Sequence, residues 1–313
     1  METANNKKTH TVLNKKTKKT IFYCLMVALP LLQFFVFYIC VNINSILLSF
    51  KTITKEISPD GSLYYAETFI GFDTFKEVFG KLFSEEMRPV WGNTLTAYFS
   101  SLLLGTTCSL LFSYYIFKKF LGASLFKVLL FLPSVVSGLV LIVMYRYFVV
   151  DVLSTIFPKM PDLLDASNSN AFYTLLVFSL WTGFGTAIMM YVGGMNNISE
   201  SILEYAQLDG VNPLQEFFHI VLPMIFPTLT TFIVVGLAGV FTNQMRLFDF
   251  YGNTAELYLQ TMGYHLYAGV QRAGSDITKF PYFAAMGLTF TLITVPITLF
   301  VRWAMQKYGP RVD

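Results

Sequence analysis

Six long runs of apolar residues, separated by shorter polar stretches, dominate the sequence. They cover roughly 21–49, 92–117, 125–148, 172–193, 224–245 and 282–305. Each run reaches the ~20 residues that a helix needs to cross a hydrocarbon core about 30 Å thick. A backbone in lipid has to satisfy its own hydrogen bonds, and a run of this length does so as a helix. The pattern predicts an all-α membrane protein with six transmembrane helices.

The stretches between these runs divide the rest of the chain. Residues 1–20 form a basic tail, and the transmembrane domain covers 21–313. Within that domain, 50–91 is predicted to be a long outer loop and 195–223 the largest inner loop. The first apolar run is too long for the 7–15-residue core of a signal peptide, so we expect it to remain as a membrane span.

Composition agrees with a membrane protein. Hydrophobic residues make up 54% of the 313 positions and charged residues only 13%, against about 25% charged residues in soluble domains. The net charge of +3 is too small to suggest a nucleic-acid partner. The low fraction of charged residues indicates that the chain lies in a lipid bilayer.

The basic residues predict the orientation. The positive-inside rule places clusters of Lys and Arg next to the membrane on the cytoplasmic side. Six spans put both termini and the second and fourth connections between spans on one side. The basic residues on that side are Lys7, Lys8, Lys15, Lys16, Lys18, Lys19, Lys118, Lys119, Lys127, Arg302, Lys307 and Arg311. We therefore expect a multi-pass protein of the cell membrane with both termini and the 195–223 loop in the cytoplasm.

That inner loop contains an unusual stretch, "EYAQLDGVNPLQEFFHIVLP", from Glu204 to Pro223. It has three acidic residues, one His and no Lys or Arg. One interpretation is an amphipathic connector on the lipid headgroups, but such helices are usually rich in Lys and Arg. An acidic surface favours the other interpretation, a docking element for a basic protein partner.

Local signals predict two short helices in this stretch. Ser201 and Glu204 have the spacing of a capping box, and Gly210 suits the left-handed residue that ends a helix. Asn212 and Gln215 form a second potential capping box, with a proline at the first helical position between them.

The same stretch resembles the cytoplasmic motif of binding-protein-dependent ABC importer permeases. That motif reads Glu-Ala-Ala, three residues, Gly, nine residues, Ile-x-Leu-Pro, with Tyr205 replacing the middle alanine in this chain. The positions in register with it are Glu204, Ala206, Gly210, Ile220, Leu222 and Pro223.

Other segments resemble the carbohydrate-uptake branch of that family. They are "FIGFDTFKEVF" at 69–79, "WGNTL" at 91–95, "FLPSVVSGLVLIVMYRYF" at 131–148 and "WTGFG" at 181–185. The family often has Gly-Gly-Pro after the fifth span, where this chain reads "LFDFYGNTAELYLQTMGYHLY". Because of this departure, the resemblance predicts neither the solute nor the local shape of the outer loop.

The resemblance implies a type I ABC importer permease fold and a set of partners. These are a second permease, expected to be a non-identical homologue, two ATPase subunits and an extracytoplasmic solute-binding protein. The chain has no phosphate-binding loop, metal-ligand motif or catalytic cluster. It is therefore expected to be a transport subunit with no cofactor, catalytic residue or metal of its own, with ATP and Mg²⁺ bound by the ATPase.

The resemblance also assigns roles within the coupling loop. Gly210 permits the sharp turn, and Ala206 allows close approach of the ATPase. Glu204 either pairs with a basic group on the ATPase or caps its own helix. The residues expected to fix the loop to the base of the fifth span are Ile220, Leu222 and Pro223.

For the solute path, polar groups at membrane depth are the first candidates. Asn243 and Gln244 end the fifth apolar run, where relatives often carry amides that line the sugar site. Trp181 could stack on a sugar ring or pack between helices, and Phe248 could lie at the outer rim.

Two alternatives remain. The chain could serve a non-sugar solute, or it could be an ion-coupled secondary transporter. Coupling to an ion gradient usually requires acidic residues within the spans, and no Asp, Glu or Lys lies deep in the six runs. The predicted function is half of the translocation path of an ATP-driven importer of a carbohydrate, either an oligosaccharide or a sugar derivative.

Overall fold

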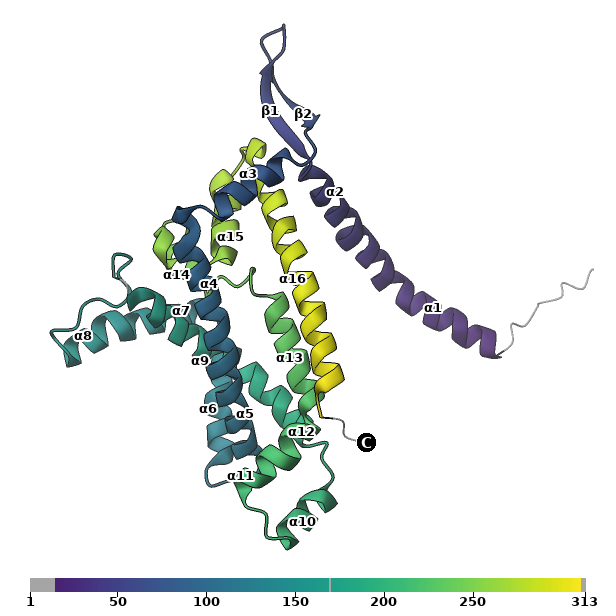
Figure 1. Cartoon of the computed structure of the whole chain (residues 1–313), viewed down its shortest axis with the longest axis vertical. Coiled ribbons are helices and arrows are strands. Elements are labelled where there is room, and N and C mark those ends of the chain that lie inside the picture. Colours follow the sequence, from purple (N-terminus) through teal and green to yellow (C-terminus); the bar gives the residue numbers. More distant parts are fainter. Residues whose placement is uncertain (1–14, 169, 311–313) are drawn as a thin grey trace, which may run out of the picture.

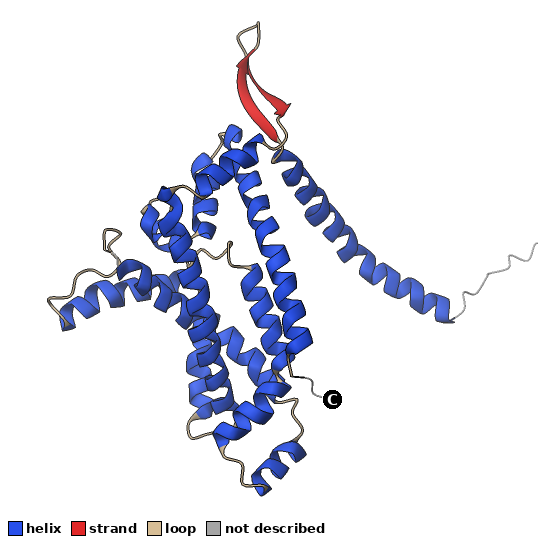
Figure 2. Ribbon diagram, viewed as in Figure 1, coloured by secondary structure: helices blue, strands red, loops and turns tan. Residues whose placement is uncertain are grey.

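The computed structural model describes residues 15–168 and 170–310. Within these ranges the chain is almost entirely helical, and its two strands form one antiparallel hairpin (Figure 2). The hairpin projects from one end of the molecule, and the short helices α10 (Glu200–Leu208) and α11 (Pro213–Glu216) lie at the opposite end (Figure 1). These are called the hairpin end and the loop end below.

The first helical rod leans away from the other helices and joins them at the hairpin end (Figure 1). It consists of α1 (Lys15–Gln33), a π-helical segment (Phe34–Cys40) and α2 (Val41–Leu48). It begins inside the predicted basic tail of residues 1–20, of which 1–14 lie outside the described residues. None of its most apolar window is buried against the rest of the chain, so this surface is available to lipid or to another subunit.

The hairpin follows directly and occupies part of the predicted outer loop 50–91. Strands β1 (Lys51–Ile57) and β2 (Leu63–Phe69) pair antiparallel, with Lys51 opposite Phe69 and Ile57 opposite Leu63. The Lys51 ammonium also lies 2.8 Å from the Glu67 carboxylate. The hydropathy pattern predicted a loop here and did not indicate the strands.

The remaining helical elements follow in chain order. They are α3 (Asp73–Leu82), α4 (Arg88–Ser100), a π-helical segment (Ser101–Gly105), α5 (Thr106–Phe117), α6 (Ala123–Val135), α7 (Gly138–Tyr147), a π-helical segment (Phe148–Val152), α8 (Leu153–Ile156), α9 (Asn170–Met195), α10, α11, a π-helical segment (Phe217–Val221), α12 (Leu222–Met224), α13 (Phe226–Ala238), α14 (Leu247–Tyr251), α15 (Met262–Ala273) and α16 (Phe280–Tyr308). Three 3₁₀ turns complete the set, at Glu85–Met87, Leu257–Leu259 and Ile277–Lys279.

The stretch 125–148, predicted as one span, is divided between α6 and α7. Pro133 lies in the last turn of α6, where it removes a backbone donor and crowds the preceding turn. Val136 and Ser137 then adopt extended backbone angles, with ψ of 144° and 131°. The chain therefore changes direction between the two helices.

The stretch 224–245 also differs from one uninterrupted helix. The helical segments before and after Ile225 meet at a bend of 70°, with Pro223 and Pro227 on either side of it. At the other end, α13 stops at Ala238, and residues 239–246 form an irregular segment. Met245 and Arg246 in that segment have φ of 50° and 60°, a left-handed conformation that is uncommon for residues other than glycine.

Among the described residues, five helices are long and apolar enough to cross a membrane. They are Lys16–Leu48, Glu85–Phe117, Gly138–Ile156, Asn170–Met195 and Ile277–Tyr308. The bent pair Pro213–Met224 and Phe226–Ala238 makes a sixth if it counts as one span. The structure is thus that of a multi-pass helical membrane protein.

Side chains from distant parts of the sequence form the packing at the loop end. Tyr114 of α5 packs with Tyr191 and Met195 of α9 and with Phe217 and Val221 from the 195–223 loop. The Tyr114 and Phe217 ring centroids are 5.1 Å apart. This cluster fixes the loop against the two helices.

Candidate functional site

A Schellman motif ends α10 at Gly210. The Gly210 amide donates to the Gln207 carbonyl at 3.1 Å, and the Val211 amide donates to the Ala206 carbonyl at 3.0 Å. The φ of Gly210 is +72°, which confirms the left-handed turn predicted for this residue. No atom lies within 4 Å of the position a Cβ would take, so the backbone conformation alone favours glycine.

The start of α10 differs from the prediction. The helix begins at Glu200 with Ser199 as its N-cap, so the predicted capping box of Ser201 and Glu204 is wrong. Glu200 supplies a negative charge to the first turn, where the helix dipole favours it. Glu204 lies in the middle of the helix, exposed, and among the described residues it has no hydrogen-bond or ion-pair partner. Its carboxylate is available for an external contact.

The start of α11 agrees with the prediction. The Gln215 amide donates to the Asn212 side-chain oxygen at 2.8 Å, and the Asn212 amide donates to the Gln215 side-chain oxygen at 3.2 Å. This reciprocal capping box is confirmed. The loop therefore consists of two short helices with defined ends and a glycine turn between them.

The outer surface of this loop exposes large apolar side chains among polar and acidic ones. Its exposed large side chains are Ile202, Tyr205, Leu208, Leu214 and Phe218. Ala206 of α10 is buried within the chain. An uncovered apolar group of this kind next to acidic residues is a typical protein-docking surface.

The far end of the loop packs into the loop-end cluster. Val221 is fully buried and Phe217 nearly so. The three motif residues next to them, Ile220, Leu222 and Pro223, are half-buried. They lie where the loop joins α13, as the resemblance predicts for residues that fix the loop to the fifth span, and this role stays a prediction.

An ion pair joins the loop to the end of α5. The Lys118 ammonium lies 3.0 Å from each carboxylate oxygen of Glu216. The side chain of Glu216 is only 3% exposed and that of Lys118 is 17% exposed. One of the four acidic residues of the 195–223 loop is therefore neutralised within the chain, by a lysine expected on the same side of the membrane.

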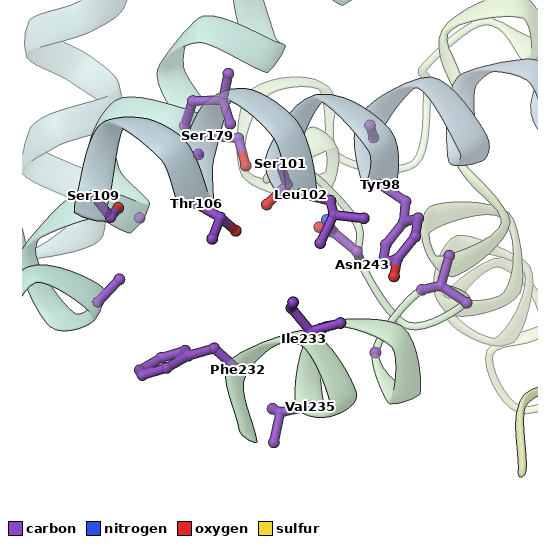
Figure 3. A pocket seen from close by; sticks show the side chains of 18 of the residues that line it. Tyr98, Ser101, Leu102, Thr106, Ser109, Ser179, Phe232, Ile233, Val235 and Asn243 are labelled. Carbon is purple, nitrogen blue, oxygen red and sulfur yellow. The ribbon is translucent and has the colours of Figure 1, made fainter. Parts of the chain in front are cut away.

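The second part of the site is a hollow of about 460 Å³ between α4–α5, α9 and α13 (Figure 3). We call it the central hollow. Hydroxyl groups dominate its polar lining, and it also contains apolar side chains and several glycines. The polar residues that line it are Thr94, Tyr98, Ser101, Thr106, Ser109, Ser179, Thr186, Tyr191, Thr242, Asn243 and Thr261. None of the described residues lining the hollow carries a formal charge.

The irregular segment 239–246 supplies the amide of the central hollow. The Asn243 side-chain oxygen accepts from the Met245 amide at 2.9 Å. The Asn243 main-chain carbonyl accepts from the Thr261 hydroxyl at 2.7 Å. Because one hydrogen bond uses the side chain and the other the main chain, the Asn243 amide is held in position with its nitrogen available to a solute.

The four predicted path residues do not lie together. Asn243 lines the central hollow (Figure 3). Gln244 is half-buried and does not line it, and Trp181 lies on a different face of α9, edge-on to Phe178. Phe248 packs edge-to-face against Tyr267, with ring centroids 4.9 Å apart. Only Asn243 of the four is placed to meet a solute in this hollow.

The hydroxyl residues that line the hollow follow a helical spacing in the sequence, which hydropathy alone does not reveal. Tyr98, Ser101, Gly105, Thr106 and Ser109 recur at spacings of one to four residues, which place them on one face of a helix. A stripe of small and hydroxyl side chains inside an apolar run could have indicated the path-lining face.

Comparison with known proteins assigns the family. Residues 90–313 match the family model described as "Binding-protein-dependent transport system inner membrane component". The chain belongs to this family, which confirms the resemblance found in the loop motif.

Individual relatives and a solved structure agree with this assignment. The chain is 22% identical over 279 residues to the arabinooligosaccharides transport system permease AraP of Bacillus subtilis, covering 86% of this chain and 83% of AraP. It is 30% identical over 178 residues to the probable ABC transporter permease YesP of the same species, covering 53% of this chain and 55% of YesP. A chain of a bacterial ABC transporter involved in the import of the acidic polysaccharide alginate has the same fold, with a TM-score of 0.71, 20% identity and coverage of 94% and 98% of the two chains.

Proposed function

We propose that the chain is one permease subunit of an ATP-driven importer of an uncharged carbohydrate. The bent pair around Ile225 then counts as the fifth of six spans, both termini lie in the cytoplasm, and the 195–223 loop faces the ATPase. Family membership and the basic residues near the loop end support this orientation.

The loop couples the permease to the ATPase in this proposal. Two ATPase subunits bind ATP and Mg²⁺, and the apolar face of α10 together with the free carboxylate of Glu204 docks on one of them. Ala206 and Gly210 keep the loop compact at the contact. A second permease completes the path, and the family description supports delivery of the solute by an extracytoplasmic binding protein.

The lining of the central hollow carries the proposal of an uncharged solute. Hydroxyl and amide groups can both donate to and accept from the hydroxyls of a sugar, and the lining offers no cation to neutralise an acidic group. Arg246 of the irregular segment lines an adjoining hollow instead, where its guanidinium lies 3.3 Å from the Asp249 carboxylate. An uncharged oligosaccharide or sugar derivative fits this lining better than an acidic one.

Uptake by reconstituted complexes tests the proposal. The chain would be reconstituted in liposomes with its partner permease, ATPase and binding protein, and given an arabinooligosaccharide or an alginate oligosaccharide. We expect ATP-dependent uptake of the neutral sugar and none of the acidic one. Uptake of only the acidic sugar would overturn the solute class, and uptake driven by an ion gradient without ATP would overturn the importer function.

A pair of variants tests the path itself. Asn243→Ala should lower uptake of the neutral sugar by about tenfold, because losing a hydrogen bond to the solute costs about 1–1.5 kcal/mol. Gln244→Ala, next to it but outside the hollow lining, is the matched control and should change uptake little. Equal effects of the two substitutions would argue against this hollow as the path.

A further inference from the structure

The attachment of the loop to α5 has three polar components at one point. Lys118 forms its two 3.0 Å contacts to Glu216. The Tyr114 hydroxyl lies 2.9 Å from the Pro213 carbonyl, to which it donates, and 3.3 Å from one Glu216 carboxylate oxygen. Two residues from α5 and its end thus hold both ends of the four-residue helix α11.

A contribution to stability alone does not explain this contact. Burial of an ion pair removes hydration from both charges, and apolar side chains of similar size often stabilise a protein as well or better. The neighbouring Tyr114 and Phe217 rings already provide apolar packing. A buried pair does, however, fix a single relative position of two elements, because a displaced partner leaves an uncompensated charge.

The two elements joined by the pair lead to opposite walls of the central hollow. Helix α5 continues through the π-helical segment into α4, and this rod supplies Ser101, Thr106 and Ser109 to one wall. The chain leaving the loop continues through α12 into α13, which supplies Phe232 and Ile233 to the facing wall (Figure 3). The loop is therefore attached to the α13 wall by the main chain, and to the α5 wall by the ion pair together with the Tyr114 hydrogen bond and the apolar contact of Tyr114 with Phe217.

We propose that Lys118 and Glu216 are positioning residues that make α5 move together with the 195–223 loop. This inference rests on the proposed function, in which the ATPase displaces the loop. Without the pair, only the Tyr114 hydrogen bond and apolar contacts would join the loop to α5. Most of the displacement of the loop would then be taken up at the 70° bend before α13, and the α5 wall would follow less closely. With it, one movement of the loop changes the position of both walls.

A labelling experiment tests this without knowledge of the solute. Thr106→Cys would be introduced on the α5 wall of the full chain, with its three cysteines replaced by serine, in the complex with its ATPase and partner permease. The rate of reaction with a methanethiosulfonate reagent would be measured without nucleotide and after trapping with ATP and vanadate. We expect trapping to change the rate by about tenfold, within the range typical of coupling between two sites.

The single variants Glu216→Gln and Lys118→Met should reduce this nucleotide-dependent change to less than about twofold while the complex still hydrolyses ATP. The exchanged pair, Lys118→Glu with Glu216→Lys, should restore it. Lys119→Gln, an exposed neighbour with no role in the contact, is the matched control and should keep the full change.

Retention of the full change in Glu216→Gln would overturn the inference. Loss of assembly in the single variants that the exchanged pair does not repair would also overturn it, because the contact would then serve only to hold the fold. Absence of any nucleotide effect in the unmodified complex would instead count against the proposed function. Restoration by the exchanged pair supports the inference whether or not the single variants assemble.

Discussion

The Thr261 hydroxyl donates a hydrogen bond of 2.7 Å to the main-chain carbonyl of Asn243. The same hydroxyl accepts from the Tyr264 amide at 3.2 Å and so caps α15. Thr261 is almost completely buried. One side chain therefore joins the irregular segment of the central hollow to the start of a regular helix.

Thr261→Val should loosen this connection. It keeps the side-chain volume but removes the partner of the Asn243 carbonyl and leaves the buried Tyr264 amide unpaired, at a cost of about 1–3 kcal/mol. We expect a lower thermal unfolding midpoint in detergent. Thr254→Val is the matched control, since the Thr254 hydroxyl is exposed and bonds only to the nearby Tyr251 carbonyl. Equal midpoints for the two variants would contradict the structural role of Thr261.

Gly263→Ala should disturb the irregular segment 239–246 by steric contact with the added Cβ. A Cβ there would lie 2.6 Å from the Thr242 carbonyl carbon and 2.7 Å from the Asn243 carbonyl oxygen. Because both atoms belong to the backbone, relief requires the segment to move, at a cost of about 1–3 kcal/mol. Sugar uptake and the unfolding midpoint should both fall. Gly287→Ala, where the nearest atom is 3.9 Å away, should leave them near normal.

Gly210→Val should destabilise the turn between α10 and α11. A left-handed residue with a β-branched side chain costs about 1–2 kcal/mol, and no contact opposes a side chain there. Hydrogen exchange at the Val211 amide, which bonds to the Ala206 carbonyl, should become faster. Gly210→Asn should preserve most of the protection, because Asn tolerates this conformation better. Unchanged exchange in Gly210→Val would show that the turn does not need a left-handed residue.

His265 should make the stability of the chain depend on pH. Burial, followed by the positive charges of Arg272 and Lys81, lowers the pKa of His265 from 6.5 to about 4. Between these values the unfolded chain binds a proton that the folded chain does not, so stability is full above pH 6.5 and falls as the pH drops towards 4. The unfolding midpoint should decrease from pH 7 to pH 5.

His265→Gln should flatten this dependence. In the folded chain the His265 Nδ1 proton is donated to the Gln260 side-chain oxygen at 2.8 Å. The glutamine amide nitrogen of the variant can donate to the same oxygen, which separates the effect of charge from that of the lost bond. A pH profile identical to that of the unmodified chain would exclude His265 as its source.

Local signals predicted the short-range features of the loop well. The left-handed glycine and the Asn212–Gln215 box depend on residues within a few positions of one another, so the sequence contains all the information needed. The prediction of Ser201 was wrong because Ser199, two residues earlier, is equally compatible with a cap and is the residue that the structure uses. Propensity does not decide between them, because the N-cap is selected by where the preceding chain leaves α9.

Contacts between residues far apart in the chain could not be predicted from the sequence. Lys118 and Glu216 are 98 positions apart, and no local pattern indicates that they meet. Hydropathy also did not reveal that residues 239–246 leave the helix, since apolar residues are equally compatible with helix and irregular backbone when neighbouring helices bury them. Thr261 holds that segment in place from outside the apolar run, and the pattern could not show this.

The apolar part of the rod Glu85–Phe117 covers residues 92–117, which at 1.5 Å per residue is about 39 Å long. A hydrocarbon core of about 30 Å is shorter than this apolar stretch. Tilting accommodates part of the difference, so the angle of the rod depends on the thickness of the surrounding bilayer. Lipids with longer or shorter acyl chains should therefore rotate one wall of the central hollow relative to α13, and the transport rate should respond to lipid chain length even when every protein contact is intact.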